Sequence, residues 1–159
     1  MDARQIILLR HAHAEPANHG EADASRVLSL RGEAEADAAG AWLREHGASP
    51  ARVLHSGAAR SRQTCERVLE VLGFSDARAD PRIYEATPAT LLRVLDDNAD
   101  AATLMLVGHN PGFEQLLGLL TEGSSVAGRG MPPAGIAWLE LAHAAAEPGS
   151  AQVRHFWWP

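Results

Sequence analysis

Three short apolar stretches of the chain are each followed by a polar side chain that could take part in catalysis. Arg10 and His11 follow the first stretch, Ser56 follows the second, and His109 follows the third. Arg60 comes four residues after Ser56. Guanidinium groups stay charged and match the geometry of phosphate oxygens, and a neutral imidazole can attack phosphorus. These residue types predict a site for phosphoryl transfer that needs no metal ion.

Strands and helices are expected to alternate along the chain. Apolar runs that end in charge are typical of strands buried on both faces of a parallel sheet. The alternation predicts an α/β protein, one domain over residues 1–159, with three layers (α/β/α) around a mostly parallel central sheet. The last two strands are expected to form an antiparallel hairpin at its edge. Strands are expected at residues 6–9, 51–56, 102–109, 135–142 and 151–158, and helices at 31–47, 58–73, 88–95 and 111–120.

Two of these helices carry more detailed expectations. Ser29 is a candidate N-cap for the first, and Asn110 and Pro111 are expected to be the N-cap and first residue of the last. The small residues of the first helix recur at helical spacing, which predicts one buried face. That face is expected to contain Ala34, Ala38, Ala41 and Trp42.

The strand ends should bring the polar side chains together. Ligands of open α/β sheets bind outside the carboxyl ends of the strands, and Arg10, His11, Ser56 and His109 all follow such ends. The positive end of the helix near Pro111 would add to the attraction for an anion. Long connections are often functional, and residues 12–28 and 123–134 are the sizeable ones here.

Composition limits the other functions that the chain could have. It has 159 residues, of which 46% are hydrophobic, enough for one substantial core. The net charge of −6 comes from scattered acids, which argues against a nucleic-acid surface. Cys65 is the single cysteine, so no intramolecular disulfide can form. The first apolar run is too short for a signal peptide or a membrane span, so we expect a cytoplasmic protein with no membrane partner.

Three segments resemble the signature motifs of a known family. "LLRHAHAEP", "HSGAARSRQT" and "LVGHNPG" are similar to those of the histidine phosphatase superfamily, and within it to the small SixA-type phosphohistidine phosphatases. Each motif alone is weak, but three in the right order are a strong signal. The resemblance implies a phosphoglycerate-mutase-like fold. One departure is Ala12, which stands where the family usually has glycine after the histidine.

The resemblance also assigns roles to residues. It implies that His11 is the nucleophile and that Arg10, Arg60 and His109 bind the phosphoryl group, with Ser56 also in the phosphate-binding set. Glu85 lies about where many members of the superfamily place a general acid, so it is a candidate for that role. No metal and no cofactor are expected.

Several functions remain open at this point. The favoured one is hydrolysis of phosphohistidine on a protein, such as a phosphotransfer domain. The first alternative is the same chemistry on a small phosphomonoester, for example a sugar or nucleotide phosphate. A metal-dependent hydrolase using His11, His13, His109 and Glu15 ranks low, because Arg10 beside a ligand would oppose a divalent cation. A phosphate-binding module without catalysis would not need the full set of histidines and arginines.

Overall fold

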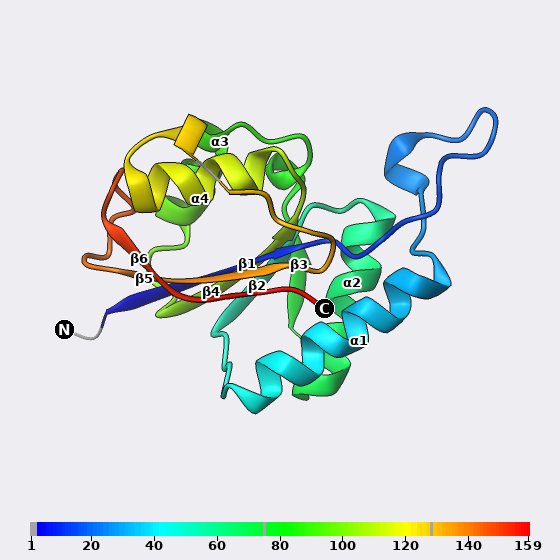
Figure 1. Cartoon of the computed structure of the whole chain (residues 1–159), viewed down its shortest axis with the longest axis horizontal. Coiled ribbons are helices and arrows are strands. Elements are labelled where there is room, and N and C mark those ends of the chain that lie inside the picture. The colour runs from blue at the N-terminus through cyan, green and yellow to red at the C-terminus, as the bar shows by residue number, and fades with distance from the viewer. Residues whose placement is uncertain (1–2, 75, 128) are drawn as a thin grey trace.

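A six-stranded sheet organises the molecule, with strand order β3-β2-β4-β1-β5-β6 (Figure 1). The computed structural model describes residues 3–74, 76–127 and 129–159. The strands are β1 (Arg4–Arg10), β2 (Arg52–His55), β3 (Ala77–Ala79), β4 (Thr103–Gly108), β5 (Ile136–Leu141) and β6 (Ala151–Trp157). The helices are α1 (Leu30–Glu45), α2 (Ala59–Leu72), α3 (Pro88–Asp97) and α4 (Gly112–Glu122), with 3-10 turns η1 (Asp23–Ser25), η2 (Pro81–Ile83) and η3 (Ser125–Ala127).

The pairing of the central strands places the two histidines beside each other. β1 pairs in parallel with β4, and their last residues, Arg10 and Gly108, are partners in the register. His11 and His109 therefore leave the sheet side by side. β2 is parallel to both β3 and β4, while β5 is antiparallel to β1 and to β6. The mostly parallel sheet and the C-terminal hairpin are both confirmed.

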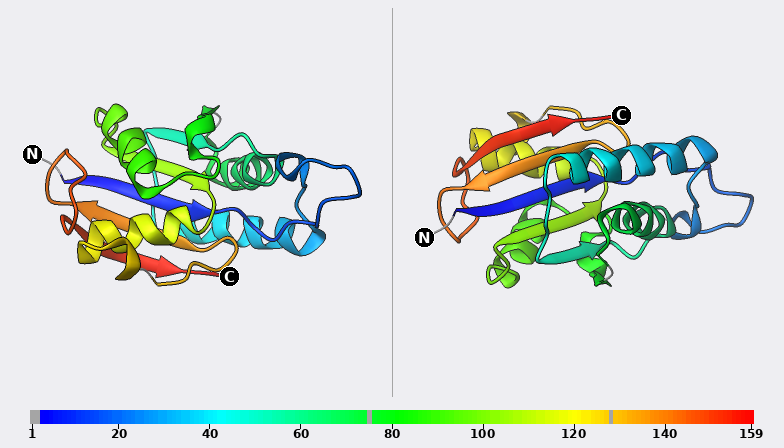
Figure 2. Two further views of the ribbon diagram at one scale, coloured as in Figure 1. Left: turned by 90° about the horizontal axis from the view of Figure 1, so that it is seen from above. Right: turned by 90° about the horizontal axis from the view of Figure 1, so that it is seen from below.

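Helices cover both faces of the sheet, which confirms the three-layer arrangement (Figures 1 and 2). Alternate residues of β1 and β4 point to opposite faces and are buried on both, as a continuous apolar run requires. One face packs against α3 and α4, and the other packs against α1 and α2. No helix in the described part of the chain is long and apolar enough to cross a membrane.

The buried face of α1 differs from the expected one. Ser29 does cap the helix, because its Oγ accepts a hydrogen bond from the Gly32 amide. Alanines occur around the whole helix, however, so their spacing does not select a face. The face that packs against the rest of the protein contains glycines, which let other segments approach the helix closely. A side chain on Gly32, for example, would clash with the His13 carbonyl. The buried residues are Gly32, Ala36, Ala39, Gly40 and Leu43, so the prediction was wrong for Ala34, Ala38 and Ala41. Trp42 is half-buried and packs against the same core.

The start of α4 also differs from the prediction. The helix begins at Gly112, with Pro111 in the N-cap position and no side-chain cap. Asn110 does not cap it: its Nδ2 donates to the Met131 carbonyl at 2.9 Å, and its Oδ1, the atom that would accept in a cap, is buried without a hydrogen-bond partner among the described residues. The asparagine instead links the end of β4 to the connection that leads to β5.

The 12–28 connection projects beyond α1 and α2 and then returns to the sheet edge (Figure 1). An isolated bridge between Ala14 and Leu28 closes its base. The Leu28 amide also donates to the side chain of Gln63 on α2 at 2.8 Å. The short turn η1 lies on the returning part, so this connection brings its own side chains to the site.

Candidate active site

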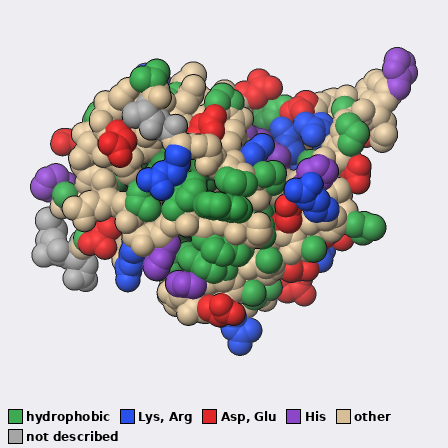
Figure 3. All heavy atoms as spheres, in the orientation of Figure 1, with side chains coloured by type: hydrophobic (Ala, Val, Ile, Leu, Met, Phe, Trp, Pro, Cys, Tyr) green, Lys and Arg blue, Asp and Glu red, His purple; other side chains and the backbone are tan. Residues whose placement is uncertain are grey.

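A cavity of about 600 Å³ lies at the carboxyl edge of the sheet. In the view of Figure 3, cationic and histidine side chains gather in the hollow beside the base of the 12–28 connection. Five predicted residues line it together, namely Arg10, His11, Arg60, Glu85 and His109. The other lining residues are Asp23, Arg26, Tyr84, Ala86, Thr87, Asn110, Pro111, Gly112 and Gln115.

His11 is held by both its backbone and its ring. Its amide donates to the Gly108 carbonyl at 2.9 Å, and its own carbonyl accepts from the Ala134 amide at 3.2 Å. Its ring Nδ1 lies 2.7 Å from the carbonyl oxygen of Ala12. Because a carbonyl only accepts, Nδ1 carries the hydrogen and Nε2 keeps its lone pair. Burial, together with the nearby cationic groups, lowers the pKa of His11 to about 3, so the ring is neutral at pH 7.

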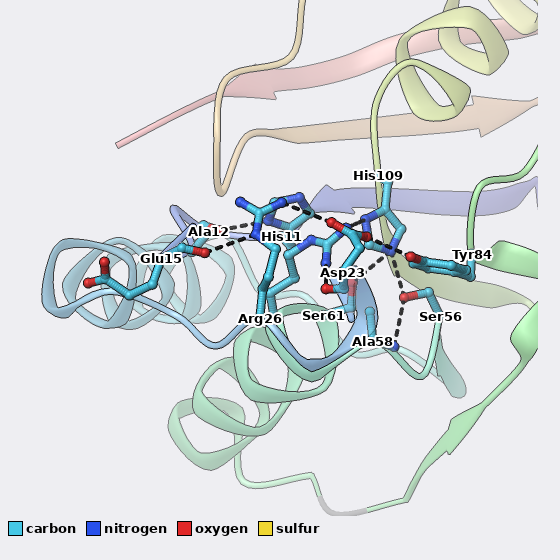
Figure 4. Close-up of polar contacts among 11 residues, drawn as sticks. His11, Ala12, Glu15, Asp23, Arg26, Ser56, Ala58, Ser61, Tyr84 and His109 are labelled. Carbon is cyan, nitrogen blue, oxygen red and sulfur yellow. Dashed lines mark hydrogen bonds and ion pairs between the residues drawn. The ribbon is translucent and has the colours of Figure 1, made fainter. Parts of the chain in front are cut away.

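His109 is fixed by contacts at both ring nitrogens. Arg60 Nη2, which can only donate, lies 3.3 Å from Nδ1, so the neutral ring carries its hydrogen on Nε2. Nε2 then donates to Ser56 Oγ at 2.7 Å and also lies 3.2 Å from Ser61 Oγ (Figure 4). Burial and the charge of Arg60 lower the pKa of His109 to about 4. An anion entering here would favour the protonated ring, which can then donate to a phosphoryl oxygen.

Three arginines line the cavity, and two of them, Arg10 and Arg60, have a donor that is unpaired within the described part of the chain. Arg10 donates through Nη1 to the Met131 carbonyl at 2.8 Å, and Arg60 donates to Asp23. In both guanidinium groups Nε is buried and has no hydrogen-bond partner among the described residues. Because an unpaired buried donor is costly, both groups gain from an anion that accepts these hydrogens.

Thr64, from the second motif, ties the segment after His11 to α2. Thr64 Oγ1 accepts from the Ala12 amide at 3.0 Å and donates to the Arg60 carbonyl at 2.7 Å. Ser56 lies behind His109 and does not line the cavity. Ala12 is fully buried in the apolar cluster beneath α1 and α2, so its methyl group does not occupy the cavity.

Glu85 lies on the rim of the cavity. Its backbone has a φ of 51°, an uncommon conformation for a residue other than glycine. Such strain is often found at functional sites. The role of Glu85 as a general acid stays a prediction.

Sequence reasoning missed three lining residues, Asp23, Arg26 and Tyr84. Asp23 and Arg26 lie on the returning part of the 12–28 connection, and Tyr84 follows η2. Neither segment has a periodic pattern that would predict where its side chains lie. For Asp23 and Arg26, the signal that could have found them was the length of the 12–28 connection. Among the residues that the structure describes, no three His, Cys, Asp or Glu side chains gather in a group that could hold a metal ion.

Comparison with known proteins places this site in a family. Residues 6–91, more than half of the chain, match the family model described as histidine phosphatase superfamily (branch 1). The chain belongs to the histidine phosphatase superfamily. An uncharacterized Mycobacterium tuberculosis protein is 37% identical over 159 residues, covering 93% of this chain and 98% of that protein. The chain spans 61% of a second uncharacterized relative, a chloroplastic Arabidopsis thaliana protein that is 32% identical over 133 residues.

Solved structures of SixA proteins have the same fold. SixA from Agrobacterium tumefaciens is similar with a TM-score of 0.87 and 29% identity, covering 100% of both chains. The protein histidine phosphatase SixA in complex with tungstate is similar with a TM-score of 0.85 and 23% identity, covering 98% of this chain and 97% of that one. The expected phosphoglycerate-mutase-like fold is confirmed. Family and fold together support a phosphatase, a hydrolase with a phosphorylated substrate.

Proposed function

We propose that this phosphatase removes the phosphoryl group from phosphohistidine on a protein, without a metal ion, through a phosphohistidine on its own His11. The observation that carries the proposal is the state of His11. Its ring is neutral, its Nδ1 hydrogen is donated to the Ala12 carbonyl, and its Nε2 lone pair is free in a cavity lined by Arg10 and Arg60. These are the requirements for attack on a phosphorus atom.

The reaction has two steps. In the first, the substrate imidazole is protonated by solvent at its other nitrogen, His11 Nε2 forms a bond to phosphorus, and the bond from phosphorus to the substrate imidazole breaks, so that this ring leaves neutral with the electron pair. In the second, water attacks phosphorus and gives a proton to solvent, the bond to His11 breaks with its electron pair returning to Nε2, and inorganic phosphate leaves. Arg10, Arg60 and His109 bind the nonbridging oxygens in both steps, since preorganised donors stabilise the charge of the transition state.

The ionised carboxylate of Asp23 favours a leaving group that needs no enzymatic acid. Hydrogen bonds from Tyr84, Arg26 and Arg60 lower the pKa of Asp23 far below its usual range. Asp23 therefore stays ionised and cannot protonate a leaving group. An imidazole can be protonated at its other nitrogen and then leaves without help, whereas an alkoxide requires a positioned acid. The rim residues Asp23, Glu85 and Thr87 are also exposed, so a side chain presented by a folded protein can reach the cavity.

The proposal is tested by brief mixing with a protein that carries radiolabelled phosphohistidine. We expect label on this chain that is labile in acid and stable in alkali, because a phosphoramidate forms. His11→Ala should abolish both the label and phosphate release. His13→Ala is the matched control, because the His13 ring bonds to Ser29 and does not line the cavity. Label that persists in His11→Ala, or activity that is lost on chelation and restored by zinc, would refute the mechanism.

A second candidate substrate is a small phosphomonoester. The observation that favours it is the position of Glu85 in the cavity lining. A general acid at this position would supply the proton that an alkoxide leaving group requires. The phosphoryl end of the site would act in the same way on either substrate.

A further inference from the structure

Asp23 binds three side chains at the cavity, although it lies on the 12–28 connection. Its Oδ2 accepts from Tyr84 Oη at 2.6 Å and from Arg60 Nη2 at 2.9 Å. Its Oδ1 accepts from Arg26 Nη1 at 3.1 Å. The Asp23 backbone carbonyl also accepts from Arg60 Nη1 at 2.9 Å. Figure 4 shows the carboxylate between the side chains of Arg26 and Tyr84.

The contacts of Arg60 divide between the two edges of its guanidinium group. A guanidinium group is planar, and its five hydrogens are fixed in direction. One edge presents hydrogens of Nη1 and Nη2, and Asp23 accepts from both with its carbonyl and its carboxylate. The other edge presents the second Nη2 hydrogen and the Nε hydrogen. Nη2 lies 3.3 Å from His109 Nδ1, and Nε is buried without a partner among the described residues.

From this division we propose that Asp23 is a positioning residue for phosphoryl transfer. It holds the Nη1 and Nη2 edge of Arg60, so that the Nη2 and Nε edge faces His109 and binds two oxygens of the phosphoryl group. The inference rests on the proposed role of Arg60 in the phosphatase reaction. It adds that a residue of the 12–28 connection, absent from all three motifs, sets the orientation of that arginine.

The same contacts could have a different meaning, in which the Asp23 carboxylate competes with phosphate for Arg60. Two observations favour positioning. Asp23 uses the edge away from His109, and the Nε donor is left for another acceptor. The two interpretations predict opposite effects: loss of a competing anion strengthens oxyanion binding, whereas loss of a positioning anion weakens it.

The test measures vanadate binding to the full chain by calorimetry, which does not depend on the substrate. Asp23→Asn keeps the shape of the side chain but removes its charge, and we expect the Kd for vanadate to rise at least about tenfold, the effect of losing one charged hydrogen bond. Asp37→Asn is the matched control, because Asp37 forms a similar two-contact pair with Arg67, outside the cavity. It should leave the Kd unchanged.

A second background separates positioning from a general loss of structure. Lysine has no planar fork to orient, so in an Arg60→Lys background Asp23→Asn should change the Kd less than about twofold. An equal loss in both backgrounds would refute positioning, as would tighter binding by Asp23→Asn alone. If the wild type binds vanadate and Asp23→Asn matches Asp37→Asn, this inference fails and the proposed function stands. A wild type that binds no vanadate would refute both.

Discussion

Replacing Thr64 by valine should show how much the segment after the nucleophile depends on one hydroxyl. Thr64 is fully buried, and its Oγ1 is the acceptor for the Ala12 amide, which is also fully buried. Valine has nearly the same shape as threonine, so it fills the same space in the core. The Ala12 amide, however, loses its hydrogen-bond acceptor. An unsatisfied buried donor costs about 1–3 kcal/mol of unfolding free energy.

Thr121→Val is the matched control for this substitution. Both threonines donate to the carbonyl four residues earlier, Thr64 to Arg60 at 2.7 Å and Thr121 to Leu117 at 2.6 Å. Of these two hydroxyls, only that of Thr64 also accepts a hydrogen bond from a backbone amide of another segment. The difference between the two variants therefore isolates the Ala12 amide, and should be about 1–3 kcal/mol.

Urea denaturation measures this difference directly, and thermal unfolding should show a fall of about 2–4 °C in Tm for each kcal/mol. Thr64→Val should also slow labelling of His11, by up to about 10²-fold, because the ring is held by the Ala12 carbonyl next to the disturbed amide. Equal unfolding free energies for Thr64→Val and Thr121→Val would refute the reasoning.

Three further predictions concern pH and the leaving group. Because burial lowers the pKa of His11 to about 3, its ring stays neutral from about pH 5 to 8, so labelling at saturating substrate, corrected for titration of the substrate, should not fall as the pH is lowered from 8 to 5. A fall on acidification with a midpoint near pH 6.5 would contradict this. Burial also lowers the pKa of His109, to about 4. The unfolded chain binds more protons than the folded one below about pH 6.5, so the free energy of unfolding, measured by denaturant titration, should decrease as the pH falls from there to about 4. Glu85→Gln should barely alter turnover of a phosphohistidine protein, and wild type should hydrolyse alkyl phosphates poorly. Efficient hydrolysis of a sugar phosphate that is lost in Glu85→Gln would favour the small-molecule substrate instead.

The gathering of these side chains at the cavity could be predicted because it follows from the topology of parallel strands. Arg10, His11 and His109 come directly after β1 and β4, and parallel neighbours end at the same edge. The position of Arg60 follows from the short turn that joins β2 to α2. None of these placements requires knowledge of how a loop folds.

The remaining features depend on contacts that no local pattern encodes. The position of Asp23 is set by the return of a long connection and by its partners Arg60 and Tyr84, which are distant in sequence. The packed face of α1 could not be chosen because alanine, a good helix former at any position, occurs on every side of that helix. The role of Asn110 was missed because its partner, the Met131 carbonyl, lies in another connection, distant in sequence.

The central place of β1 in the sheet also has a consequence for how the protein is made. β1 is synthesised before its neighbours β4 and β5, and its register with them joins Arg10 to Gly108 and Leu9 to Ile136. Pairings of such large sequence separation form slowly, because a long loop must close before any contact compensates for the lost entropy. The apolar run Ile6–Leu9 therefore leaves the ribosome without the strands that will cover it, which exposes it to aggregation or to a chaperone. His11 and His109 meet only when β4 has docked, so catalytic competence arises late in the life of the nascent chain.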